Sequence, residues 1–311
     1  MSGPSPAVRT RKNVYTLGNP GDDLDWYSKA VAALKNLPIT DPTSWRYQGA
    51  VHGYPGHDQD PFAVNGEALP SNADQRTYWN QCQHGTWFFL PWHRNYLACF
   101  EEIIAATVVK LGGPPGWALP YWNYSDTTNP NAPSLPPAFL DENNPLWLAG
   151  RNMTTSADQI PASHVSLACL THAAFDGSAN GGDPGFGGPE TVFNHVGATF
   201  GWLENLPHNV VHDDVGGLMS DPDTAALDPI FWLHHANIDR MWAVWNNRDP
   251  SFTDPTDPAW LTKIPFVLHD SNGEVVTFTS SQMTDTTKVR HGYQYDNISD
   301  PITQPAAAAA S

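Results

Sequence analysis

Two long helices are the strongest constraint that this sequence places on its fold. Pro91 fits the opening turn of the first helix, which is predicted to run to about Lys110, with apolar side chains recurring at helical spacing. The Gly-Gly-Pro at residues 112–114 then ends it. The second helix is predicted to begin at Asp228-Pro229, an N-cap followed by a proline in the first helical position, and to end near Asn246.

The rest of the chain carries weaker signals. Shorter helices are expected around residues 45–51 and 203–213, and weak strand-like alternation extends over residues 266–295. Residues 126–145, rich in proline and asparagine, indicate a long ordered loop, whereas the glycine-rich residues 176–189 indicate a flexible one. The sequence therefore predicts a mainly α protein with long loops and a few short strands.

Charge limits the partners of such a chain. Asp and Glu total 32 against 15 Lys and Arg, which gives a formal net charge of −17. Such a surface repels phosphate backbones and anionic lipids, so neither nucleic acid nor a membrane is expected as a partner. No apolar run is long enough to span a bilayer, and the N-terminus shows no secretory signal, so a cytoplasmic location is expected.

Histidine is unusually frequent, at 13 residues, in a chain that is otherwise poor in basic side chains. His208 and His212, at positions i and i+4, would leave one helix face together, and His235 shares a helix face with Asp239, a carboxylate able to order a ligand imidazole. With 13 histidines among 311 residues, any given spacing between two histidines is expected roughly 0.5 times by chance. The spacing alone is therefore no evidence for a metal site. An all-imidazole set without carboxylates would favour copper, zinc or iron.

The remaining histidines give no such signal. We expect surface or hydrogen-bonded core positions for His164, His172, His195, His269 and His291.

The sequence around the histidines is more specific than their spacing. Residues 82–101 (CQHGTWFFLPWHRNYLACFE) resemble the first copper-binding signature of the tyrosinase family of type 3 copper proteins. Residues 206–217 (LPHNVVHDDVGG) and 228–245 (DPIFWLHHANIDRMWAVW) resemble the second. The resemblance covers roughly residues 8–295, and residues 292–297 (GYQYDN) resemble the Tyr-x-Tyr motif that closes the family's catalytic domain.

This resemblance implies an architecture as well as a cofactor. The expected fold is a four-helix bundle holding a dicopper centre, within a single catalytic domain over residues 1–300 and a disordered tail over residues 301–311. Because the resemblance ends near Tyr295, a short form without the C-terminal shielding domain is expected. Two copper ions are implied, with O2 as co-substrate.

The resemblance also assigns ligands. It implies that His84 and His93 hold the first copper together with a third histidine, for which His52 is preferred and His57 is the competitor. For the second copper the implied ligands are His208, His212 and His235. Of the adjacent pair, His235 is the ligand, and His234 lies beside the site near the substrate entrance.

Other residues acquire roles from the same resemblance. Cys82, two residues before His84, is either a buried free thiol or is joined to that histidine by a thioether bond. Glu204 and Asn209 are implied to hold a water that takes the proton of a phenol, whose ordinary pKa is near 10. Asp213, with Asp214, would place negative charge at the mouth and disfavour substrates that bear a carboxylate.

Pro222 occupies the place of a gate residue over the first copper, where a small rigid side chain implies an open entrance. The implied activity is the oxidation of phenols and catechols to o-quinones, including ortho-hydroxylation of monophenols. The partners are therefore small phenolic or catecholic substrates, and a copper-delivery partner is not identified by the sequence. The alternatives are a catechol oxidase or o-aminophenol oxidase without activity on monophenols, and a haemocyanin-like protein that only binds O2.

Overall fold

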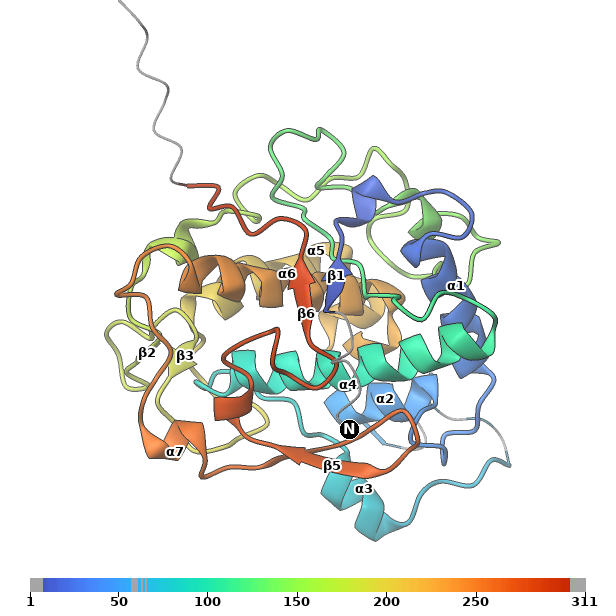
Figure 1. The fold of residues 1–311 in the computed structure, drawn as a ribbon, viewed down its shortest axis with the longest axis horizontal. Coiled ribbons are helices and arrows are strands. Elements are labelled where there is room, and N and C mark those ends of the chain that lie inside the picture. The colour runs from blue at the N-terminus through green and yellow to red at the C-terminus, as the bar shows by residue number, and fades with distance from the viewer. Residues whose placement is uncertain (1–7, 57–60, 63, 65, 303–311) are drawn as a thin grey trace, which may run out of the picture.

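Helices surround a core of aromatic and aliphatic side chains in a computed structural model of the chain, which describes residues 8–56, 61–62, 64 and 66–302. In Figure 1, α4 crosses the middle of the molecule, with α6 on one side and α2 on the other. The helices are α1 (Asp23–Lys35), α2 (Trp45–His52), α3 (Asn72–Tyr78), α4 (Phe89–Lys110), a π-helical segment (Glu204–Asn209), α5 (Val210–Val215), α6 (Pro229–Asn246) and α7 (Pro258–Leu261). The mainly α class expected from the sequence is confirmed.

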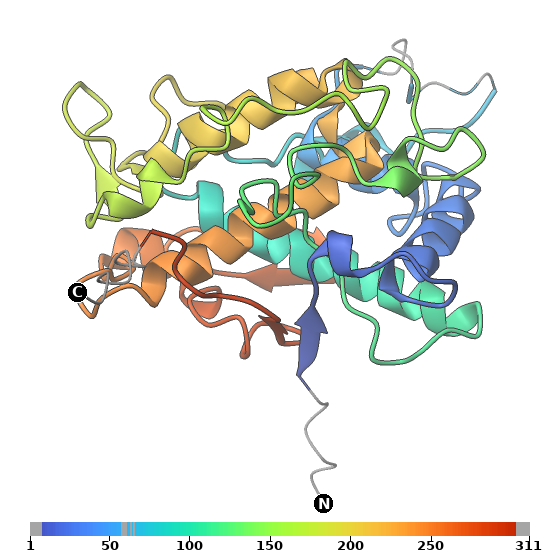
Figure 2. The ribbon, with the colours of Figure 1, turned by 90° about the horizontal axis from the view of Figure 1, so that it is seen from above.

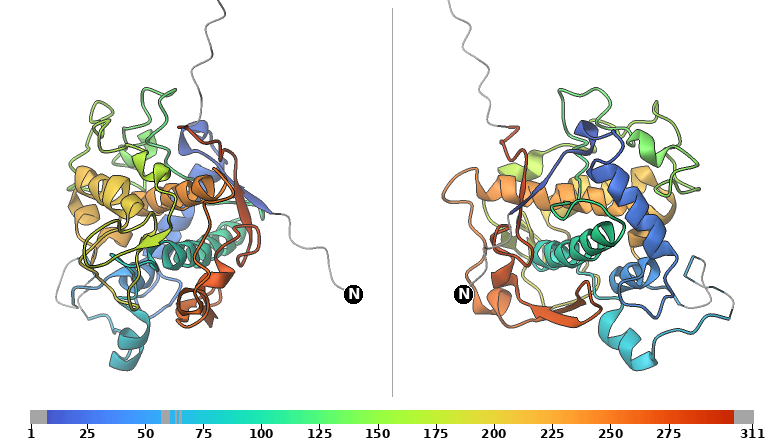
Figure 3. Two further views of the ribbon diagram at one scale, coloured as in Figure 1. Left: turned by 90° about the vertical axis from the view of Figure 1, so that its left-hand side faces the viewer. Right: turned by 45° about the vertical axis from the view of Figure 1, so that its right-hand side comes forward.

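The two long helices lie where the sequence predicted them. The Asp228 side chain accepts a hydrogen bond from the N–H of Ile230 at the start of α6, as its N-cap position required. Helices α4 and α6 contact each other along the core, and α1 packs against α4 (Figures 2 and 3). The stacked rings of Phe100 and Trp232 join α4 to α6.

The strands are short and lie at the periphery. They are β1 (Arg9–Arg11), β2 (Asp176–Gly177), β3 (Gly188–Pro189), β4 (Phe266–His269), β5 (Val275–Phe278) and β6 (Tyr293–Tyr295). Strands β4 and β5 form an antiparallel pair, whereas β6 runs parallel to β1 and joins the two ends of the described chain (Figure 1). The ends of the glycine-rich segment, β2 and β3, also pair in parallel.

One predicted helix is divided. The sequence favoured a single helix over residues 203–213, but Leu206 has extended backbone angles inside this stretch. Pro207 follows it and has no N–H to donate to a preceding turn. The result is a π-helical segment followed by α5, which together carry His208 and His212.

None of the described helices combines the length and apolar character that a bilayer-spanning helix needs. The division into a domain over residues 1–300 and a tail from residue 301 stays a prediction, because residues 303–311 lie outside the described part of the chain.

Candidate metal centre

Six of the predicted ligands gather in the interior between α2, α4, α5 and α6. His52 ends α2, His84 precedes α4, His93 lies in the first turns of α4, and His235 lies on α6. Five of the six are buried, and His212 is half-buried and forms the solvent side of the cluster. The rings of His93 and His235 stack with centroids 4.5 Å apart, so the two predicted trios adjoin each other. The competitor His57 lies outside the described residues.

Hydrogen bonds fix the orientation of these imidazoles. The Nδ1 atom of His52 lies 2.9 Å from the carbonyl oxygen of Pro222, and that of His93 lies 2.8 Å from the carbonyl of Phe89. On the other side of the cluster, His212 Nδ1 lies 2.7 Å from the carbonyl of Met219. Because a carbonyl oxygen can only accept, each Nδ1 carries the proton and each Nε2 keeps a lone pair for a metal.

The free nitrogens converge. His235 Nε2 lies 3.2 Å from His208 Nε2 and 3.3 Å from His212 Nε2, and His52 Nε2 lies 3.4 Å from His93 Nε2. Two nitrogens bound to one ion at tetrahedral angles, as in zinc–imidazole sites, lie roughly 3.3 to 3.4 Å apart. Because His52 and His93 both carry their proton on Nδ1, the lone pairs of their Nε2 atoms repel each other unless a cation lies between them, so this donor set fits metal ions.

The ligand atoms of the first trio do not form one close group, whereas those of the second trio do. His52 forms one close group with Cys82 and His84, and a second close group with His93 and His235. The ring of His84 lies 5.4 Å from that of His52 and 5.3 Å from that of His93. The three rings of the first trio are therefore mutual neighbours, and His52 shares a close group of ligand atoms with each of the other two histidines.

Burial prepares these side chains for metal binding. Desolvation lowers the pKa of all six imidazoles, and for His212 the value falls to about 4. The rings are then neutral at pH 7, which is the form that coordinates a metal.

His234 is also buried beside the second trio, with its ring 5.3 Å from that of His208. Neither of its ring nitrogens has a hydrogen-bond partner among the described residues. The sequence could not decide from spacing alone which histidine of the pair faces the centre. Both have a ring nitrogen close to those of His208 and His212, since the ligand atoms of all four histidines lie within 4.8 Å of one another. The Nε2 of His235 contacts two other imidazoles and its ring stacks on His93, whereas the ring of His234 also lies next to Tyr124. These contacts favour His235, and its assignment as the ligand stays a prediction.

Cys82 lies close to His84, as the Cys-x-His spacing suggested, with its Sγ 3.5 Å from Nδ1 of that ring. A further residue, His195, was expected to have no special role. Its Nδ1 lies 3.1 Å from both the Sγ and the carbonyl oxygen of Cys82. A contact between residues 113 positions apart leaves no local signal in the sequence.

Glu204 and Asn209 both contact the segments that carry predicted ligands. The carboxyl group of Glu204 is fully buried and accepts the N–H of Gly85, the residue after His84, at 2.9 and 3.0 Å. Burial raises the pKa of Glu204 well above its ordinary range, although the Gly85 hydrogen bond opposes this rise. Asn209 Oδ1 lies 2.8 Å from Nδ1 of His208 and fixes the orientation of that ring.

The expectation that Asp239 orders a ligand imidazole is wrong. Its carboxylate is buried between the guanidinium groups of Arg11 and Arg94, and it accepts hydrogen bonds from the hydroxyls of Tyr293 and Tyr295 at 2.6 and 2.5 Å. Both guanidinium groups lower its pKa, against the opposing effect of burial. Asp239 therefore anchors the N-terminal strand and the Tyr-x-Tyr motif to α6.

Of the residues predicted at the entrance, His234 is fully buried, whereas Asp213 and Pro222 lie at the surface. Asp213 and Pro222 are exposed, whereas the carboxylate of Asp214 lies 2.8 Å from Nδ1 of His164. Pro222 also has a role that the sequence did not indicate, because its carbonyl orients His52. This close approach depends on Gly53, where a Cβ would lie 2.5 Å from the Pro222 oxygen.

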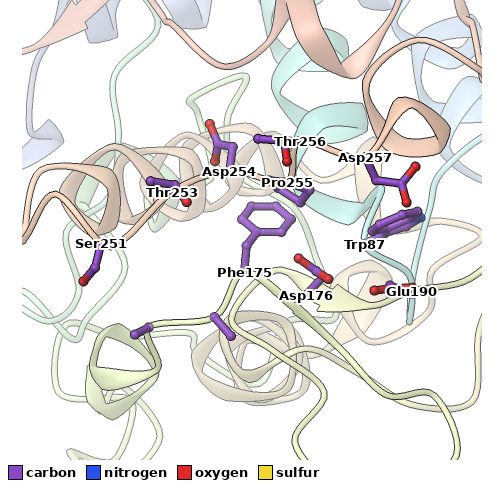
Figure 4. A pocket seen from close by; sticks show the side chains of 12 residues that line it. Trp87, Phe175, Asp176, Glu190, Ser251, Thr253, Asp254, Pro255, Thr256 and Asp257 are labelled. Atoms are coloured by element: carbon purple, nitrogen blue, oxygen red, sulfur yellow. The ribbon is translucent and has the colours of Figure 1, made fainter.

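A separate hollow contains none of the predicted ligands (Figure 4). Its volume is about 420 Å³, and the carboxylates of Asp176, Glu190, Asp254 and Asp257 line it together with Trp87. The histidine cluster is therefore the site that matches the sequence signatures.

Two adjoining trios of buried imidazoles carried by helices are typical of proteins that bind a pair of metal ions. The sequence matches the common central domain of tyrosinase over residues 42–171 and 137–248. The chain therefore belongs to the tyrosinase family.

Individual relatives support this assignment. The chain is 44% identical to the tyrosinase HcTyr1 of Hahella sp. (strain CCB-MM4), an alignment that covers 93% of this chain and 63% of that protein. It superposes on Grenache (Vitis vinifera) polyphenol oxidase with a TM-score of 0.70 at 28% identity, covering 96% of this chain and 88% of the other. A structure of active aurone synthase, a polyphenol oxidase with a copper B site, gives a TM-score of 0.71 at 26% identity, covering 96% and 87%.

The family assignment fixes the cofactor. Tyrosinases and polyphenol oxidases are type 3 copper oxidoreductases that use two copper ions with O2, and the histidine groups of this chain fit such ions. The chain spans about half of the length of the chloroplastic polyphenol oxidases that it matches.

Proposed function

We propose that this chain oxidises phenols and catechols to o-quinones with O2 at a dicopper centre. The observation that carries the proposal is the convergence of imidazole Nε2 atoms from α2, α4, α5 and α6, each pair about 3.3 Å apart. We assign His52, His84 and His93 to one copper and His208, His212 and His235 to the other. When bound, the copper ions supply the binding and reduction of O2, chemistry that no amino-acid side chain provides.

The protein contributes orientation and exclusion of water. The carbonyls of Pro222, Phe89 and Met219 hold three imidazoles in the tautomer that offers Nε2 to a metal. The rings of Phe89 and Phe231 pack against the histidines. The ring centroids of Phe231 and His235 lie 4.1 Å apart, and those of Phe89 and His208 lie 4.8 Å apart. These apolar walls leave the half-buried His212 side as the route for a substrate.

We further propose that the enzyme accepts monophenols as well as catechols. A phenol binds a metal well only after losing its proton, so a positioned acceptor speeds this step. Glu204 and Asn209, which touch the segments of His84 and His208, are our candidates for holding a water that accepts it. Bound copper ions add positive charge that favours the ionised form of Glu204 and counteracts its raised pKa.

Cys82 belongs to the same proposal. Its buried thiol contacts the ring of His84, and we propose that a thioether bond joins Sγ to a ring carbon of that histidine in the mature protein. Forming this bond breaks the S–H bond and one ring C–H bond, and the two protons and two electrons pass to O2, the oxidant of the proposed activity. A mass lower by two hydrogens in the peptide pair that contains both residues would support the bond. An unmodified peptide carrying a free Cys82 thiol would contradict it.

Oxygen uptake by the copper-loaded protein tests the activity. The substrates are 4-methylphenol, 4-methylcatechol and o-aminophenol, with metal-free protein and His235→Ala as controls. A monophenol consumes one O2 for each quinone and water formed, whereas two catechols share one O2. Uptake with both phenol and catechol is expected. Uptake with the catechol or the aminophenol alone would refute monophenol hydroxylation, and binding of O2 without turnover of any substrate would favour an oxygen carrier.

A further inference from the structure

A second hollow is lined by none of the six predicted ligand histidines. Its volume is about 840 Å³, within the usual range for small-molecule sites. Three stretches of chain that are distant in sequence form its walls, namely residues 123–128, 159–167 and 297–302, and Arg240 contributes from α6. Part of the wall is apolar, because Ile160, Val165 and Leu167 line it.

Arg240 differs from the other buried arginines of the described chain. Arg11, Arg94 and Arg151 each form an ion pair with a buried carboxylate. Arg240 is only 6% exposed, yet it forms no ion pair with any described residue, and its Nε has no hydrogen-bond acceptor. A buried guanidinium without a counterion is costly, so its presence beside a hollow requires an explanation.

The acidic residues nearby are already engaged. Asp126 accepts hydrogen bonds from the backbone N–H and hydroxyl of Thr128, and Asp300 pairs with Arg248. Asp296 accepts the hydroxyl of Tyr121 at 2.6 Å. The ring of Tyr121, 5.0 Å from the guanidinium carbon, gives Arg240 a weaker compensation. Burial accordingly lowers the pKa of Arg240, which indicates that its charge is not fully balanced.

We propose that this hollow binds a small organic monocarboxylate, with its carboxylate on the Arg240 guanidinium and its apolar body against Ile160, Val165 and Leu167. One guanidinium balances one negative charge and can hold both oxygens of a carboxylate. A phosphate dianion fits less well, because Asp126 and Asp300 line the same hollow and the chain carries a net charge of −17.

The hollow lies near the histidine cluster but is separate from it. Tyr124 lines the hollow, and its ring lies 5.7 Å from that of His234, which in turn stacks 5.3 Å from His208. Arg240 and His235 also lie on the same helix, α6. The carboxylate site is nevertheless separate from the proposed substrate route beside His212, so its test does not depend on oxidase activity.

Calorimetric titration of the copper-loaded protein tests the proposal. The probe is 3-phenylpropanoate, which has no phenolic hydroxyl to be oxidised, and the matched control is its uncharged amide. We expect one saturable site for the carboxylate and none for the amide. Arg240→Met should weaken binding roughly tenfold or more, the loss expected for a charged hydrogen bond. This variant should fold, because methionine replaces an unpaired buried charge with an apolar side chain of similar length.

Two further variants separate the site from general effects. Ala162→Trp narrows the hollow from an exposed position of its wall and should weaken binding while leaving Arg240 in place. Arg46→Met removes a partly buried arginine that pairs with Glu67 away from the hollow, and should bind as the unmodified protein does. The proposal would be overturned if Arg240→Met bound the carboxylate as well as the unmodified protein does, or if the amide bound as well as the carboxylate. It would also be overturned by no binding at millimolar carboxylate, or by crystallographic density for the probe at the histidine cluster alone.

Discussion

Replacement of Asp239 by asparagine should be among the most destabilising conservative changes in this chain. The carboxylate balances two buried guanidinium groups, from residues that precede it by 228 and 145 positions, and accepts two tyrosine hydroxyls, from residues that follow it by 54 and 56. Asparagine keeps the shape but removes the charge and directs an amide N–H towards donors. Arg11 would retain Glu101, whereas Arg94 would retain the carbonyl of Met283 and the ring of Trp242.

Breaking a buried ion pair by neutralising one partner costs about 3 to 5 kcal/mol. Since Arg11 keeps a second carboxylate, we expect a loss of about 3 kcal/mol for Asp239→Asn, a large part of the 5 to 15 kcal/mol typical of whole domains. Urea unfolding of the metal-free protein, followed by far-ultraviolet circular dichroism, measures it. Because none of the described histidines forms a hydrogen bond with Asp239, the copper-loaded variant should still bind two copper ions.

Asp23→Asn is the matched control, because Asp23 pairs with the half-exposed Lys12 and should contribute less than about 1 kcal/mol. A loss below 1 kcal/mol for Asp239→Asn would refute the electrostatic reasoning. Loss of one copper without loss of stability would instead return Asp239 to the role of ordering a ligand.

Three further outcomes are expected. His235→Ala should lower the copper content from two ions to about one, whereas His234→Ala should retain two, as measured by metal analysis; the opposite pattern would exchange their roles. Burial alone would raise the pKa of Glu102, but the hydrogen bonds and charges of His291 and Arg290 outweigh burial and lower this pKa to about 2. The ionised Glu102 therefore stabilises the fold above pH 4.5, and this stabilisation is lost as the pH falls towards 2. Glu102→Gln should remove about 2 kcal/mol of that acid-dependent stability in urea titrations at pH 7 and pH 3, and an unchanged pH dependence would contradict the assignment. Exposed Asp213 should make a catechol carboxylate a poorer substrate than dopamine, and Asp213→Asn should reduce the difference; equal turnover of both substrates by the unmodified protein would refute the charge argument.

Local features of the sequence were sufficient for the two long helices. Pro91, the glycines at 112 and 113, and the Asp228-Pro229 cap act within one helical turn of the boundaries that they set, so α4 and α6 lie where they were predicted. Five of the six predicted ligands lie inside the signature segments, so the sequence was sufficient to name them, although their assignment as ligands stays a prediction. Where a backbone irregularity interrupted the helix, at Leu206, local propensity predicted one helix and the chain formed two segments.

The orientation of the ligands depends on tertiary structure. The carbonyl that holds His52 belongs to Pro222, 170 residues away, and Cys82 meets His195 across 113 residues. Asp239 has the helical spacing of a residue that supports a ligand, yet its partners are Arg11, Arg94 and two tyrosines of β6. Capping and periodicity are properties of neighbouring residues and can be predicted from them. The partner of a buried polar group depends on which distant segments the fold brings into contact, and the sequence around that group does not contain this information.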